Sequence, residues 1–335
     1  MAHSHHNHSH DHGNGHEHTH GAIDPSIAST EKGIWAIKWS FIGLMVTALI
    51  QVVIVYLSGS VALLADTIHN FGDAATAIPL WIAFLFARKQ ANKRFSYGFG
   101  RVEDLAGMAI VGTILFSAIV AGYQSIHRLI YPDPMSHVWV VAGAALIGFI
   151  GNEAVAVFRI NVGRNIGSAA LIADGKHARV DGLTSLAVLA GALGTWLGYP
   201  VADPIIGIGI TIAILKIVWD SAKTVFQRVL DGVDPEIIDQ IRHSADHTER
   251  VAEVSDVRAR WIGHEIRAEL SVAVQPDLTI EEGHNIAIQV RHNLLHDLDF
   301  LTDAVVHIDP VDESGDEYHR VEDHSHGEHG VHSHP

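Results

Sequence analysis

Two stretches of the chain repeat one pattern of acidic residues and histidine within apolar surroundings. Residues 62–73 read ALLADTIHNFGD and residues 170–181 read ALIADGKHARVD, so both follow A-L-x-A-D-x-x-H-x-x-x-D. On an α-helix, positions i−3, i and i+4 lie on one face. The pattern therefore gathers two acids and one histidine on one face of each helix: Asp66, His69 and Asp73, then Asp174, His177 and Asp181.

These six side chains have the chemistry of a site for a divalent metal ion. Carboxylates are costly inside a bilayer, so they normally face the interior of a helix bundle and mark a pathway. Interhelical hydrogen bonding would explain one such residue, but not two copies of the pattern. Two His and two Asp satisfy tetrahedral Zn²⁺, whereas Mg²⁺ and Ca²⁺ prefer six or more oxygens. We therefore interpret four side chains as one transport site: His69, Asp73, His177 and Asp181.

The first acid of each copy has a different predicted role. Asp66 and Asp174 lie nearly one helical turn from the four proposed ligands. We expect them to be auxiliary residues that guide ions or accept protons, because their position does not favour direct binding of the metal. Lys176 and Arg179 flank the second copy, and we expect them to pair with acidic groups or to extend toward the membrane surface.

The helices that carry both copies are predicted to lie in a membrane. Of the 335 residues, 48% are hydrophobic and only 18% are charged. About 20 apolar residues suffice to cross a bilayer. Runs of that length predict six transmembrane helices, of which the second and fifth carry the repeat: residues 34–57, 60–87, 103–129, 137–158, 168–197 and 201–225.

The distribution of basic residues predicts the orientation of these spans. Residues 87–101, between the second and third spans, contain five Lys or Arg, whereas the connections LSGS and LGYPVADP contain none. By the positive-inside rule the basic loop is cytoplasmic, and six spans then place both termini in the cytoplasm. We find no cleavable signal peptide and no organelle signal, so we expect the bacterial cytoplasmic (inner) membrane.

The chain after Asp231 has the pattern of a small α/β domain. A helix is expected over residues 234–248, followed by strands over 251–262 and 264–274. A second helix, over 279–298, opens with a capping box formed by Thr279 and Glu282. A last strand covers 303–310, and the order αββαβ suits helices packed on one face of a small sheet.

The two ends of the chain are rich in histidine. Residues 1–20 contain nine histidines, and the C-terminal tail has the same character. Such segments cannot form an apolar core, and we expect them to be disordered and to capture or buffer metal, because neutral imidazole is a common ligand. The predicted organisation is an N-terminal tail, a membrane domain, a cytoplasmic metal-binding regulatory domain and a C-terminal tail: residues 1–32, 33–230, 231–312 and 313–335.

Charge and cysteine content exclude two kinds of site. The formal net charge is −16 with histidine neutral, which argues against nucleic-acid binding because such binding depends on a basic surface. The chain has no cysteine, so disulfides and thiolate metal sites are absent. An intramembrane metalloprotease would need H-E-x-x-H on a helix, and none of the predicted membrane helices carries this motif. We therefore do not expect an enzyme.

Four short motifs resemble those of the cation diffusion facilitator family of divalent-metal exporters. They are HNFGD, HARVD, YGFGRVE and HIDP, and the resemblance extends from about Ile34 to Pro310. It implies a zinc-type metal/proton antiporter that works by alternating access. It also implies a homodimer with a ferredoxin-like cytoplasmic domain that binds Zn²⁺ as a regulatory ligand.

The resemblance also implies a metal site in the cytoplasmic domain. His307 and Asp309 match the closing pair of the family, and His284 matches its helix histidine. A further family histidine falls at Ser271, and we expect His264 to take its place. Some members carry another site in the basic loop, but the matching positions here are residues that cannot bind zinc: Asn92, Phe95 and Phe99.

Two residues beside the third span have predicted roles at its cytoplasmic end. The resemblance pairs Arg101 with an acid after the sixth span, here Asp231. Glu103 is interpreted as a helix N-terminal acid favoured by the helix dipole, although a role in transport is the alternative.

The leading functional hypothesis is export of Zn²⁺ from the cytoplasm in exchange for protons, across the lipid bilayer. Histidine must be neutral and carboxylates ionised for metal to bind, so binding releases protons. Opening to a more acidic outside would protonate His69 or His177 and release the ion. Co²⁺, Cd²⁺, Ni²⁺, Fe²⁺ and Mn²⁺ remain alternative substrates, since affinity order alone does not select zinc. A membrane metal sensor or scaffold is the alternative outside transport.

Overall fold

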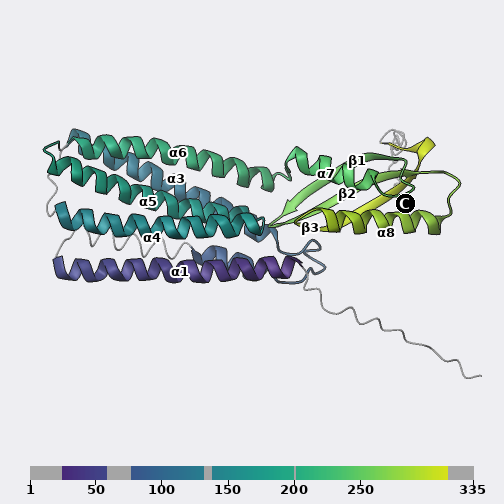
Figure 1. The fold of residues 1–335 in the computed structure, drawn as a ribbon, viewed down its shortest axis with the longest axis horizontal. Coiled ribbons are helices and arrows are strands. Elements are labelled where there is room, and N and C mark those ends of the chain that lie inside the picture. The colour runs from purple at the N-terminus through teal and green to yellow at the C-terminus, as the bar shows by residue number, and fades with distance from the viewer. Residues whose placement is uncertain (1–24, 59–76, 132–137, 200, 316–335) are drawn as a thin grey trace, which may run out of the picture.

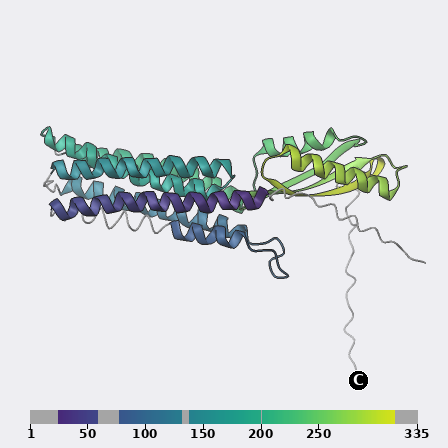
Figure 2. The ribbon, with the colours of Figure 1, turned by 60° about the horizontal axis from the view of Figure 1, so that its bottom comes forward.

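The computed structural model describes residues 25–58, 77–131, 138–199 and 201–315. Figure 1 shows two parts that follow one another along the long axis of the molecule. A bundle of long helices forms one part, and a small sheet with two helices forms the other. The view in Figure 2, turned by 60°, shows the same end-to-end arrangement.

Five long helices run side by side in the first part. Their bounds are α1 Pro25–Ser58, α3 Arg101–Ile130, α4 Val138–Asn165, α5 Ala169–Trp196 and α6 Ala202–Val229. A shorter apolar helix, Ala77–Ala87, precedes α3. Most side chains of these helices are apolar, and many large ones are exposed, including Trp39 and Phe116. An exposed apolar surface of this extent fits a lipid environment.

Four helices of the described segments are long and apolar enough to cross a membrane. They are Ser29–Ile54 within α1, and the whole of α3, α4 and α6. Helix α5 also has 28 residues, but it carries the acids, bases and histidine of the second repeat, which lower its hydropathy. Most of the second predicted span lies outside the described residues. The structure thus confirms a helical membrane-type domain, and the number of six spans stays a prediction.

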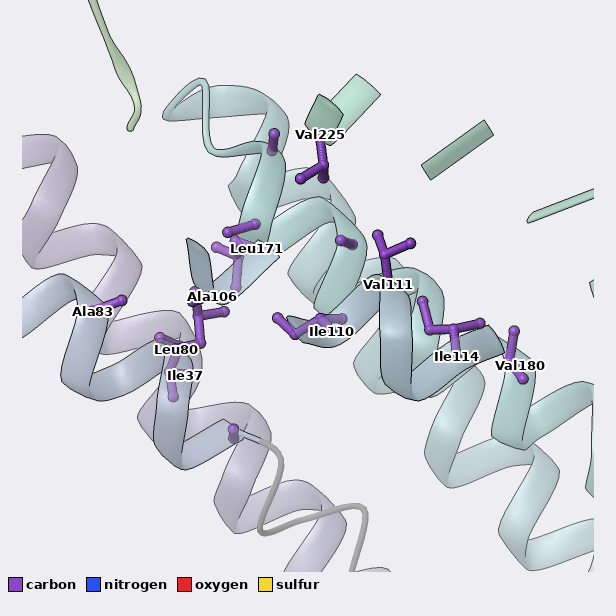
Figure 3. Close-up of a cluster of buried hydrophobic side chains, with 14 of the residues drawn as sticks. Ile37, Leu80, Ala83, Ala106, Ile110, Val111, Ile114, Leu171, Val180 and Val225 are labelled. Carbon is purple, nitrogen blue, oxygen red and sulfur yellow. The ribbon is translucent and has the colours of Figure 1, made fainter. Parts of the chain in front are cut away.

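The core of the bundle consists of aliphatic and small side chains from several helices. Figure 3 shows Ile37 of α1 and Leu80 of the helix Ala77–Ala87 near Ala106 of α3. Leu171 and Val180 of α5 belong to the same cluster. This packing fixes α5, the helix with the second repeat, in the interior of the bundle.

The second part has the predicted αββαβ order. Its elements are α7 Pro235–Asp246, β1 Glu253–Ile262, β2 Glu265–Val274, α8 Ile280–Asp297 and β3 Leu301–Pro310. The sheet order is β1-β2-β3. Strands β1 and β2 pair antiparallel. Strands β2 and β3 pair parallel, because α8 returns the chain to the end of the sheet at which β2 begins. The predicted capping box at Thr279 and Glu282 is present.

Alternation along the strands decides which residues face the helices. Leu270 and Val272 of β2 and Ile308 of β3 belong to the apolar core beneath α7 and α8. Side chains at the intervening positions lie on the opposite face of the sheet. Within the described residues the sheet has three strands, so it lacks the first strand of the βαββαβ ferredoxin-like pattern. The resemblance to a ferredoxin-like fold thus reduces to a small α/β domain.

Candidate metal centre

Helix α5 presents the three residues of the second repeat to the interior of the bundle. The helix begins after Ser168, whose Oγ accepts a hydrogen bond from the backbone N–H of Leu171 at 3.0 Å. The exposed fractions of Asp174, His177 and Asp181 are 0%, 2% and 5%. Three ionisable side chains buried on one helix are costly unless they serve a function. The exposed fractions agree with the burial that the sequence predicted for these three side chains.

His177 and Asp181 lie close enough to act on one ion. His177 Nδ1 is 3.8 Å from Asp181 Oδ2, one helical turn away. The two groups offer one nitrogen and two oxygen atoms, a mixed donor set that suits zinc-like ions. The other half of the proposed site, at Asp66, His69 and Asp73, lies outside the described residues. That the two halves meet remains a prediction.

Asp174 has a partner that the sequence did not point to. Arg159 Nη1 of α4 lies 2.9 Å from Asp174 Oδ2, and both side chains are buried. The Nε–H of Arg159 donates a hydrogen bond to Ser40 Oγ of α1 at 2.8 Å. A guanidinium at this distance balances the carboxylate charge. Arg159 thus links Asp174 of α5 to α4 and α1. This structural contact differs from the ion-guiding role that was expected for Asp174. A lone arginine within the apolar stretch AVAVFRINV was the available signal.

Close approach of α4 and α5 depends on a glycine beside Asp174. A Cβ atom at Gly175 would lie 2.8 Å from Ile160 Cγ1 and 3.0 Å from Ile160 N. These distances are too short for any larger residue, so Gly175 permits the contact between the helices. Further along the same interface, Arg179 forms an ion pair of 2.6 Å with Glu153 of α4. The pairing predicted for Arg179 with an acidic group is confirmed.

The predicted cytoplasmic site does not come together within one chain. His307 Nε2 lies 2.9 Å from Asp309 Oδ1 on β3, and both line a cavity of about 280 Å³ with Glu269. These residues lie on the face of the sheet opposite α8, the helix that carries His284. Among the described residues, no group of three or more His, Asp or Glu is arranged to hold a metal ion.

His264 lies at the wrong end of the sheet to serve that site. It directly precedes β2, and the parallel register places Ile266 beside Leu301, at the start of β3. His307 lies beside Ser271, seven residues further along β2, which is a separation of about 20 Å at about 3.3 Å per residue. The expectation that His264 replaces the missing histidine is therefore wrong. It lies against the membrane domain, where its Nδ1 is 2.7 Å from Glu103 Oε2.

Asn92, Phe95 and Phe99, the three loop positions at which some family members bind zinc, make contacts that stabilise the basic loop before α3. Asn92 Oδ1 accepts hydrogen bonds from the backbone N–H groups of Arg94 and Phe95, both at 2.9 Å. The rings of Phe95 and Phe99 lie 4.9 Å apart. These contacts close the loop through a side-chain amide and aromatic packing.

The cytoplasmic end of α3 joins the end of α6. Arg101 forms an ion pair with Asp231, as the resemblance implied, and its Nη1 also donates to the carbonyl oxygen of Arg228 at 2.9 Å. Glu103 is buried against His264, so it is more than an acid stabilised by the helix dipole. The two partners are 161 positions apart in the chain, which explains why the sequence did not reveal the pair.

Comparison with known proteins gives two family matches. Residues 37–230 match the cation efflux transmembrane domain, and residues 233–311 match the cytoplasmic domain of cation efflux proteins. Together they include α3 to α6 and the whole of the small α/β domain.

Individual relatives agree with these matches. A probable cation efflux system protein of Mycobacterium tuberculosis is 53% identical over 291 residues, which cover 87% of this chain and 88% of the relative. A manganese efflux system protein of Bacillus subtilis is 26% identical, over 80% of this chain and 92% of its own length. A solved MamM CTD in a manganese form is 25% identical, covers 23% of this chain and 96% of its own, and superposes with a TM-score of 0.22.

Proposed function

Because the chain belongs to the cation efflux family, we propose that it exports Zn²⁺ from the cytoplasm in exchange for protons. Members of this family are transporters, so the chain is a cation efflux transporter and not an enzyme. The proposed pathway passes through one site formed by two helices: His69, Asp73, His177 and Asp181.

The observation that carries this proposal is the burial of His177 and Asp181 on one face of α5, 3.8 Å apart. An imidazole and a carboxylate buried together form half of a tetrahedral zinc site. The repeat supplies the same two residue types, His69 and Asp73, from another predicted span. Loading requires neutral imidazole and ionised carboxylate, so an acidic exterior favours release of the ion and uptake of protons.

Export of Mn²⁺ is the second candidate function. The likeness to a manganese efflux system protein favours it. Mn²⁺ binds most weakly of the first-row divalent ions at nitrogen and oxygen sites, and it suits carboxylate and carbonyl ligands better than imidazole. Two histidines in the proposed site therefore support zinc over manganese, with cobalt as the nearest competitor.

Competition among ions distinguishes these substrates. With the protein in liposomes that carry a pH gradient, we expect Zn²⁺ uptake to be inhibited by Co²⁺ and Cd²⁺. We expect Mn²⁺ at an excess of about tenfold to have little effect, because its affinity for imidazole is low. Metal flux and lumenal pH would be recorded together. Inhibition by Mn²⁺ at a lower concentration than by Co²⁺ would instead identify a manganese exporter, and flux without a pH change would exclude proton exchange.

We also propose an orientation with both termini in the cytoplasm of a bacterial inner membrane. The basic loop 88–100 and the small α/β domain lie at the same end of the bundle, since Arg101 pairs with Asp231. Four basic residues in that loop, and Arg101 directly after it, support a cytoplasmic location by the positive-inside rule. The His-rich termini at that side would then meet metal before it is exported.

The cytoplasmic domain is proposed to bind Zn²⁺ as a regulatory ligand in a homodimer. His307 and Asp309 offer two donor groups on the open face of the sheet, fewer than the four that a structural zinc ion takes. Within one chain His284 lies on the helix side, so a second copy would have to supply the remaining donors.

Two histidine variants test this assignment. We expect His307→Gln to weaken Zn²⁺ binding by about tenfold or more, because a donor is removed. We expect His264→Gln to leave the affinity unchanged, because this histidine is at the other end of β2. Titration calorimetry on a chain without the His-rich termini, in the Asp181→Ala background, would isolate this site. Equal loss of affinity in the two variants would contradict the assignment.

A further inference from the structure

The connection between β1 and β2 is the part of the cytoplasmic domain that enters the end of the helix bundle. We call residues 261–264 the docking turn. His264, within this turn, is 4% exposed, and its partner Glu103 at the start of α3 is 1% exposed. The Nδ1 atom of His264 lies 2.7 Å from Glu103 Oε2, within hydrogen-bonding distance. Two buried polar side chains are thereby paired across the joint between the two domains.

The docking turn also contacts α1 and the helix that follows the first repeat. His264 Nε2 is 3.2 Å from Thr30 Oγ1 of α1. The ring of His264 lies 5.8 Å, centroid to centroid, from the ring of Phe84. Phe84 belongs to the helix Ala77–Ala87, and the chain immediately before that helix contains Asp66, His69 and Asp73. One imidazole thus touches three separate elements of the membrane domain.

The backbone of the turn is fixed to α3 by Gly263. Its N–H donates to Asp104 Oδ2 at 3.2 Å. The φ angle of Gly263 is +65°, a left-handed conformation that favours glycine. A Cβ at this position would lie 2.8 Å from the carbonyl oxygen of Gly100. The sequence W-I-G-H therefore forms a turn that approaches the start of α3 more closely than a larger residue would allow.

Arg228 links the docking turn to the beginning of α5. Its Nη1 donates to the carbonyl oxygen of Gly263 at 3.1 Å and to that of Gly167 at 2.5 Å. The guanidinium also lies 3.8 Å from the ring centroid of Trp261, a cation–π contact. Gly167 precedes Ser168, the residue that caps α5. The same side chain therefore holds the docking turn and the start of the helix that carries His177 and Asp181.

We propose that the docking turn couples the cytoplasmic domain to the transport helices, with His264 and Glu103 as its central positioning residues. The inference rests on the proposed function, because alternating access requires the cytoplasmic ends of the ligand-carrying helices to move. The turn contacts elements that adjoin both halves of the repeat. Any opening of the helix bundle at its cytoplasmic end must break the contacts of the docking turn or move the cytoplasmic domain together with the helices. By reciprocity, a ligand that changes the position of the domain changes metal affinity in the membrane.

The histidine–carboxylate pair distinguishes this joint from a purely apolar contact. An apolar joint would tolerate sliding of the two surfaces, whereas a buried ion pair or charged hydrogen bond is stable in one geometry and unfavourable when separated. Such an element has two discrete arrangements, docked and released, as coupling between sites requires. His264 and Glu103 do not touch the transported ion and act through the helices that they position.

Hydrogen exchange on the full chain in nanodiscs tests the coupling. In the unaltered protein, we expect Zn²⁺ to change amide exchange over residues 258–266, and Asp181→Ala to abolish that change. In Glu103→Gln and His264→Gln, exchange over these residues should rise by about tenfold or more without metal, as expected for loss of a hydrogen bond to a charged group, and should no longer respond to Zn²⁺. The matched controls Glu249→Gln and His247→Gln, both exposed, should behave as the unaltered protein does.

Flux measurements on the same variants complete the test. We expect the half-saturating Zn²⁺ concentration to shift by about fivefold or more, within the usual range of coupling between sites, while the maximal rate is largely retained. Retained metal response of exchange in both pair variants would overturn the coupling. The coupling would also be overturned if flux in the unaltered protein depends on Asp181 while amide exchange in the docking turn does not respond to metal. Flux and exchange that are both insensitive to Asp181→Ala would instead overturn the proposed transport site.

Discussion

Asp181→Ala is expected to reduce Zn²⁺ flux to the level of protein-free liposomes. Asp181 is buried on the same face of α5 as His177. It supplies one of only four proposed ligands. Loss of a group that merely orients a ligand typically weakens a metal site by about 10–100-fold, so loss of a ligand itself should exceed about 100-fold. The coupled change in lumenal pH should disappear together with the flux.

The matched control is Asp220→Ala. Asp220 is an exposed carboxylate of α6, so its removal takes the same charge from another membrane helix without touching the proposed site. Both variants would be checked for expression and for monodisperse elution before reconstitution. Undiminished flux in Asp181→Ala would mean that the repeat is structural and that ions take another path.

A second large effect is expected when the buried pair of Arg159 and Asp174 is broken. Either Arg159→Met or Asp174→Leu alone leaves an uncompensated charge in the bundle, which typically costs about 3–5 kcal/mol. For a domain of this size such a loss lowers the unfolding temperature by roughly 10 °C. The double replacement removes both charges and should restore most of the stability, because apolar substitution of a buried pair is often neutral.

Flux in the double variant separates two roles for Asp174. A carboxylate whose task is to balance Arg159 becomes dispensable once Arg159 is gone, so the double variant should transport Zn²⁺ better than either single variant. Thermal unfolding in detergent and flux in liposomes would be measured for all four combinations. A double variant that is stable yet inactive would show that Asp174 binds ions or protons directly.

Local patterns in the sequence were sufficient to predict much of the architecture. Spacing on α5 predicted the shared, buried face of His177 and Asp181. Alternation and capping signals predicted the αββαβ order, including the pair Thr279 and Glu282. The Arg101–Asp231 contact was also confirmed. The features of α5 and of the small domain depend on neighbouring residues, whereas the Arg101–Asp231 contact joins residues 130 positions apart and was implied by the family resemblance.

Contacts between distant segments were not accessible in the same way. Arg159 and Asp174 belong to different helices, and no periodicity links them. His264 was assigned by its proximity in sequence to Ser271, whereas the direction of the strands determines its position. A β–α–β connection makes β2 and β3 parallel, so residues that precede β2 lie beside the start of β3, far from His307. The polarity of the two strands is thus enough to exclude His264 from a site at His307.

The pairing of Glu103 with His264 also constrains the order of assembly. A ribosome adds about 5–20 residues per second, so the 161 residues that separate these partners take on the order of 10–30 s to synthesise. All of the membrane helices leave the ribosome before His264 does. The carboxylate at the start of α3 therefore lacks its histidine partner while the membrane helices are synthesised. The contact can form only after the β1–β2 connection of the last domain has been made.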